Sequence, residues 1–73
     1  MTVTVLVDRA GITKFRLDAT FNDFGAIYTL PNGISILSKN IRYGARIDTY
    51  RIDIDDDKDA VWFMLSYGGE IVK

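Results

Sequence analysis

One stretch decides the fold of this chain: DAVWFMLSYGGEIV, at residues 59–72. Its tryptophan, methionine and leucine side chains permit a helix on propensity alone, whereas the alternation along the stretch favours a strand. The glycine pair at 68–69 stops a helix and is typical of the two-residue turn of a β-hairpin. We therefore predict a strand over 60–67, followed by a turn and a last strand over 70–72.

This predicted strand has two apolar faces. Alternate residues form the bulkier face, which we expect to fill the core: Val61, Phe63, Leu65 and Tyr67. Because side chains alternate between the two faces of a strand, Trp62 and Met64 are then expected to point outward. Tryptophan and methionine are enriched at protein interfaces, so an uncovered Trp62–Met64 face predicts contact with a partner protein or with a second copy. The structural alternative is that a neighbouring helical turn covers it.

The same alternation extends toward the N-terminus. Its clearest example is 14–21, where four apolar residues alternate with charged and polar ones. Asp8–Gly11 and Leu30–Gly33 have the residues of tight turns. Ile47 is out of phase with the apolar residues that follow it, which predicts a bulge near residues 48–49. The expected strands are 2–8, 14–21, 26–30, 34–38, 46–54, 60–67 and 70–72.

Short strands joined by turns indicate an all-β domain. Because 73 residues are few for two full sheets, we expect a small antiparallel meander of six or seven strands. The strands should form a partly open barrel, and residues 1–73 should make up a single domain. At most one short helical turn is expected, near 39–43. This topology resembles the small oligonucleotide/oligosaccharide-binding barrels, although no sequence motif supports that family and a fold alone fixes no function.

The sequence contains neither histidine nor cysteine. It therefore lacks the commonest general base near neutral pH, the usual soft metal ligands, the thiol nucleophile and any disulfide. Its lysines fall in polar stretches, and no glycine-rich phosphate loop is present. We expect no enzyme activity, no cofactor and no metal site.

Carboxylates occupy every second position of segment 53–59. Calcium loops use this spacing, but they also need a glycine where Lys58 stands and a glutamate where Met64 stands. We expect instead a solvated loop that keeps a strand edge from pairing with another chain, or an acidic surface for a basic partner. The candidate partner-binding residues of this segment are Asp55, Asp56 and Asp57.

Segment 39–51 is the basic counterpart, with four lysine and arginine residues and only one aspartate. Arginines around an aromatic residue suit single-stranded nucleic acid, because they pair with phosphates while the ring stacks on bases. The net charge of −1 for the whole chain favours local pairing of these arginines with Asp48 and Asp53. The candidate binding residues are Arg42, Tyr43, Arg46 and Arg51.

These features favour a non-enzymatic protein-binding module, a small intracellular adaptor or inhibitor that occludes a protein partner. Phages and other mobile elements make standalone chains of this kind. The alternatives are a nucleic-acid-binding barrel that uses 39–51, and a structural subunit that buries the Trp62 face in a homo-oligomer. No apolar run approaches the ~20 residues that span a bilayer, and 1–7 lacks the pattern of a signal peptide. We therefore expect a cytoplasmic protein with no membrane partner.

Overall fold

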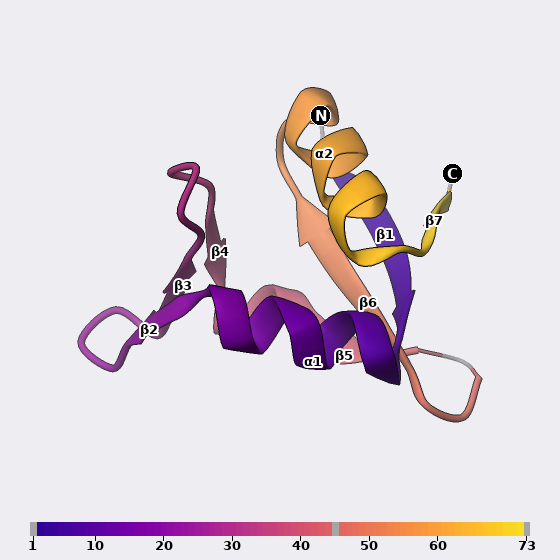
Figure 1. Cartoon of the computed structure of the whole chain (residues 1–73), viewed down its shortest axis with the longest axis horizontal. Helices are drawn as coiled ribbons and strands as arrows, with labels where there is room; N and C mark the ends of the chain where they lie inside the picture. The colour runs from indigo at the N-terminus through magenta and orange to yellow at the C-terminus, as the bar shows by residue number, and fades with distance from the viewer. Residues whose placement is uncertain (1, 45, 73) are drawn as a thin grey trace.

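The computed structural model describes residues 2–44 and 46–72, which form two antiparallel sheets and two α-helices (Figure 1). The elements follow one another as β1 (Val3–Asp8), α1 (Arg9–Asp18), β2 (Thr20–Asn22), β3 (Ile27–Thr29), β4 (Ser35–Leu37), the 3-10 helix η1 (Ser38–Asn40), β5 (Ile41–Tyr43), β6 (Thr49–Ile54), α2 (Asp57–Tyr67) and β7 (Glu70–Val72). The larger sheet has the strand order β5–β6–β1–β7, and the smaller has the order β2–β3–β4.

The predicted all-β barrel is wrong. The structure has antiparallel strands as expected, but they form two separate sheets that do not close, and two predicted strands are helices. Most of 14–21 belongs to α1, and 60–67 belongs to α2. The fold is therefore mixed α and β.

Helix α1 begins where the sequence predicts a turn. The Asp8 side chain accepts a hydrogen bond from the Gly11 N–H over 2.8 Å, which makes it the N-cap of the helix. Gly11, Ile12 and Phe15 are spaced along one helical face and are buried. Leu17, which strand alternation pairs with Phe15, is 81% exposed. Helical spacing therefore decides which residues α1 buries.

Helix α2 begins inside the acidic segment. The Asp56 side chain accepts from the backbone N–H groups of Lys58 and Asp59, over 2.8 and 3.4 Å. The carboxylates of the first turn interact favourably with the N-terminal end of the helix dipole. The helix ends at Gly68, whose φ of 76° and ψ of 176° are accessible essentially to glycine alone. The acidic segment is thus a helix start.

Several predictions of local structure are confirmed. Strand β1 matches the strand predicted over 2–8, and β7 matches the one over 70–72. The Leu30–Gly33 turn closes through a hydrogen bond of 2.9 Å from the Gly33 N–H to the Leu30 carbonyl oxygen, with Gly33 at a φ of 94°. The helical turn predicted near 39–43 is η1, but it ends at Asn40, and β5 follows at once.

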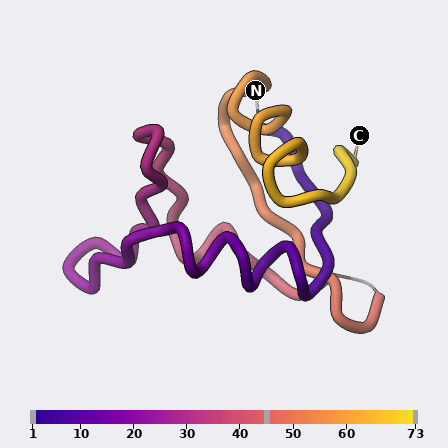
Figure 2. Tube along the Cα trace, viewed as in Figure 1, coloured from indigo at the N-terminus to yellow at the C-terminus, as the bar shows by residue number. Residues whose placement is uncertain are grey.

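Both helices pack on one face of the larger sheet (Figure 1). Helix α1 also carries the chain from the larger sheet to the smaller one, as the trace in Figure 2 shows. The buried core lies between these layers and comprises Val5, Val7, Ile12, Phe15, Leu30, Ile36, Ile52, Ile54, Ala60, Phe63 and Tyr67. Alternate residues of β1 and β6 face the helices, while Thr4 and Asp53 lie opposite each other on the outer face.

The helices are short. Within 2–44 and 46–72, neither has the length and apolar character needed to cross a bilayer.

Candidate functional site

A groove of about 670 Å³ lies at the β7 edge of the larger sheet. We call it the edge groove. Its lining comes from the starts of β1 and α2 and from the end of β7, and consists of Thr2, Val3, Thr4, Asp57, Val61, Ile71 and Val72. Four of these side chains are aliphatic, so the groove is suited to an apolar ligand with a polar end.

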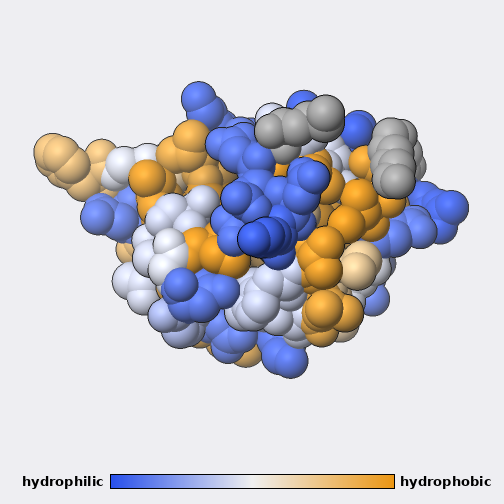
Figure 3. All heavy atoms as spheres, turned by 90° about the horizontal axis from the view of Figure 1, so that it is seen from above, coloured by the Kyte–Doolittle hydropathy of each residue, from blue (hydrophilic) through white to orange (hydrophobic). Residues whose placement is uncertain are grey.

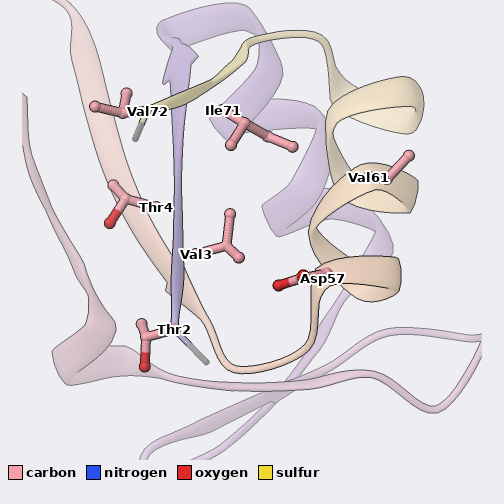
Figure 4. Close-up of a pocket in the computed structure, with 7 residues that line it drawn as sticks. All are labelled: Thr2, Val3, Thr4, Asp57, Val61, Ile71 and Val72. Atoms are coloured by element: carbon pink, nitrogen blue, oxygen red, sulfur yellow. The ribbon is translucent and has the colours of Figure 1, made fainter.

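The side chains approach the edge groove from both faces of the sheet (Figure 4). Val3 and Ile71 point into the space between β1 and α2, and the Asp57 side chain points into the same space from the start of the helix. Thr4 and Val72 are register partners, and they lie on the opposite side of β1. The groove therefore runs around the edge of the sheet.

Asp57 and Val61 form the helical wall of the edge groove. Asp57, Val61 and Leu65 follow one another at intervals of four residues, so they share a helical face. Val61 is 42% exposed and Leu65 is 76% exposed. A strand period of two along this stretch predicts that both lie in the core. That assignment is wrong, whereas Phe63 and Tyr67 are buried as predicted.

The three aspartates predicted to bind a partner have different roles in the structure. Asp57 lines the edge groove, Asp56 caps α2, and the Asp55 side chain accepts a hydrogen bond from the Thr2 hydroxyl over 3.4 Å. All three are exposed. Across 2–44 and 46–72, no three acidic side chains gather in a way that could hold a metal ion. The acidic segment thus contributes one carboxylate to the groove.

Trp62 and Met64 do not form a common outward face. Two positions along a helix correspond to about 200° of rotation, so the two side chains lie on nearly opposite sides of α2. Each is half-buried and packs against the core. Trp62 meets the Tyr67 ring edge-on at 5.9 Å and borders a smaller hollow of about 320 Å³ with Lys14 and Pro31. The outward strand face predicted for them is wrong, and their contact with a partner stays a prediction.

The residues predicted to bind nucleic acid lie on different surfaces. Arg42 is on the outer face of β5, and its Nη2 pairs with Asp53 Oδ2 at 2.7 Å. Tyr43 is the next residue of the strand, so it faces the other way, and its ring lies 5.4 Å from that of Tyr50. Arg46 is exposed in the loop before β6. Arg42 therefore pairs locally with an aspartate, as the interpretation without nucleic-acid binding expects.

Arg51 shares the outer face with Arg42, because the two are register partners across β5 and β6. The described residues therefore do not bring the arginines and Tyr43 into one binding surface.

A partly buried hydrogen bond joins the C-terminal ends of the two helices. The Tyr67 hydroxyl donates to Asp18 Oδ2 over 3.0 Å. Burial raises the pKa of Tyr67 from 10.0 to about 12, and both the hydrogen bond and the negative charge of Asp18 add to the effect. The fold therefore favours the neutral phenol.

This shift predicts a loss of stability in alkali. The contribution of Tyr67 is fully present below pH 10, the pKa of an unperturbed tyrosine, and is lost as the pH rises through about 12. We expect Tyr67→Phe to cost about 1 kcal/mol at pH 7, from the lost hydrogen bond, and to flatten the stability curve between these two pH values. Urea unfolding at pH 8 to 12, with Tyr43→Phe as the matched control, measures both effects. An unchanged pH dependence in Tyr67→Phe would contradict the assignment.

Comparison with known proteins returns no relative. No family model, curated protein or solved structure matches this chain. The edge groove is therefore the feature that bears on function.

The groove is not predicted from the sequence, although one signal for its helical wall is present there. Ala60, Phe63 and Tyr67 have helical spacing, and that spacing leaves Val61 and Leu65 on the outside. The β7 side of the groove carries no such signal, because it depends on the pairing of β1 with β7.

Proposed function

We propose that the chain is a non-enzymatic protein-binding module, a small intracellular adaptor or inhibitor that holds a segment of a partner protein in the edge groove. The observation that carries this proposal is the combination of four aliphatic side chains and one carboxylate at an open sheet edge. Binding sites are typically concave and mostly apolar, with a few polar groups that fix orientation. An intracellular location is supported by the absence of cysteine, since small secreted domains commonly rely on disulfides.

The end of the molecule at which α2 begins has a mixed surface. Figure 3 views the end of the molecule at which α2 begins, and hydrophobic and hydrophilic residues lie side by side there. Protein interfaces likewise combine apolar and polar residues. This surface therefore supports protein binding better than it supports binding of a nucleic acid, which needs an extended basic surface.

Selection from a library of random peptides tests the proposal. Wild-type protein should select peptides that bind at least about fivefold more weakly to Val61→Gln, because an apolar wall of the groove is lost. Leu17→Gln is the matched control, since Leu17 is also an exposed aliphatic residue of a helix but lies outside the groove. It should retain binding within about twofold. Failure to select any peptide, or equal binding by both variants, would contradict the proposed function.

A further inference from the structure

We propose that the occupant of the edge groove is an extended apolar segment that adds to β7 as a further strand and carries a lysine or arginine at one end. This inference rests on the proposed function and specifies the structure and chemistry of the partner segment.

The first reason is the open edge of the sheet. β7 is the outermost strand of the order β5–β6–β1–β7, and within the described residues it pairs with β1 alone. The unpaired N–H and carbonyl groups of an edge strand are a template for another strand. An added strand would lie about 4.8 Å from β7, beside the groove that Ile71 and Val72 line.

The second reason is the shape of the edge groove. Ile71 faces the helix side of the sheet, and Val72 lies on the opposite side. A strand presents alternate side chains to these two faces at once, whereas an amphipathic helix presents a single apolar stripe. A groove that runs around the edge is therefore matched by a strand, whose alternate residues would lie on the side of Ile71 and on the side of Val72.

The third reason is charge. Asp57 points into the groove from the start of α2, and among the described residues its carboxylate has no hydrogen-bond or ion-pair partner. Asp57 points toward Val3 in Figure 4, so a cationic side chain is favoured at the end of the bound segment nearer the start of α2. Residues 71–73 of a second copy would also bring two apolar side chains and a lysine, so self-association is the rival occupant that sedimentation of the protein alone tests.

The test of strand addition uses the tightest peptide that the library selection yields. Each backbone amide is methylated in turn, which removes one hydrogen-bond donor at a time. An added strand turns every second amide toward β7, so affinity should fall by about tenfold at alternate positions and hold at the others. A selected peptide that binds as a helix, or that shows no two-residue alternation, would overturn the inference.

The test of charge is a double-variant cycle with the same peptide. Asp57→Asn should weaken binding by about threefold, and replacement of the basic end residue of the peptide by alanine should have the same effect. The two changes together should cost no more than either alone, because they remove the same interaction. Asp23→Asn is the matched control, since Asp23 is exposed and lies outside the groove. Additive losses, or a selected peptide with no basic residue, would overturn the charge assignment.

The two proposals fail in different ways. A peptide that depends on Val61 but shows no alternation leaves the protein-binding function intact and removes strand addition. Sedimentation of the protein without peptide is a separate experiment that measures its oligomeric state. If the wild type forms a dimer that Val61→Gln dissociates while Leu17→Gln does not, the occupant is a second copy and the inference is overturned.

Discussion

Phe15→Ala is expected to cost about 3–5 kcal/mol of unfolding free energy, as large truncations in protein cores do. Phe15 is fully buried on α1, and its ring centroid lies 5.4 Å from that of Tyr28, 5.3 Å from Phe63 and 5.9 Å from Tyr67. It therefore joins α1, α2 and the smaller sheet. A chain of 73 residues is expected to have a total stability of roughly 4–11 kcal/mol, so this variant should be largely unfolded or close to it.

Leu17→Ala is the control that separates a helix from the predicted strand. A strand over 14–21 would place Phe15 and Leu17 on the same buried face, and both truncations would then be costly. In the structure Leu17 is 81% exposed, so its truncation should change stability by less than about 0.5 kcal/mol. Urea unfolding followed by circular dichroism measures both variants. Equal losses would show that α1 does not bury the face described here.

Gly69→Ala is expected to cost about 3 kcal/mol, from backbone strain together with overpacking. Gly69 has a φ of 112°, which residues with a Cβ rarely adopt. An added Cβ would also collide with the carbonyl oxygen of Leu6 and meet Val7 Cγ1 at 3.0 Å. Because Leu6 belongs to β1, relief of this clash must move β7 away from its only neighbour among the described strands, and the edge groove should be lost with it.

Two other glycines separate strain from collision. Gly68 has a φ of 76° with open space around the position of a Cβ, so Gly68→Ala should cost only the strain, about 1 kcal/mol. Gly25 has no close contact and no positive φ, so Gly25→Ala should be nearly neutral. The midpoints of urea unfolding should rank the variants in this order. A Gly69→Ala variant as stable as Gly68→Ala would refute the close approach of β7 to β1.

Local signals account for the elements that the sequence predicts well. In β1, β-branched residues alternate along one short segment, and the Pro-Asn-Gly of 31–33 has the backbone preferences of a tight turn. Both are confirmed in the structure. The helix starts had local signals too, since Asp8 and Asp56 are good N-cap residues. Asp8 lies three residues before Gly11, a spacing that fits a tight turn as well as a helix N-cap. This spacing alone therefore does not decide between a turn and a helix start at Asp8.

The candidate site is harder to predict, because its residues are distant in the chain. Val3, Val61 and Val72 line one groove only because β1 pairs with β7 while α2 packs across them. Of the residues predicted to bind a partner, Asp57 alone lines that groove. Its place there follows from its position in the first turn of α2, which a strand over 60–67 does not provide.

The sequence by itself determined the chemistry that is open to this protein, since a chain without histidine or cysteine has neither imidazole nor thiol to use. It also determined β1, β7 and the turn before β4, where local preferences point one way. Only the tertiary structure decided between strand and helix at 14–21 and 60–67, because the apolar residues there satisfy both periods. In the fold, Phe15 and Phe63 bury helical faces against the sheet, and their rings pack at 5.3 Å, a contact between residues that are far apart in the sequence.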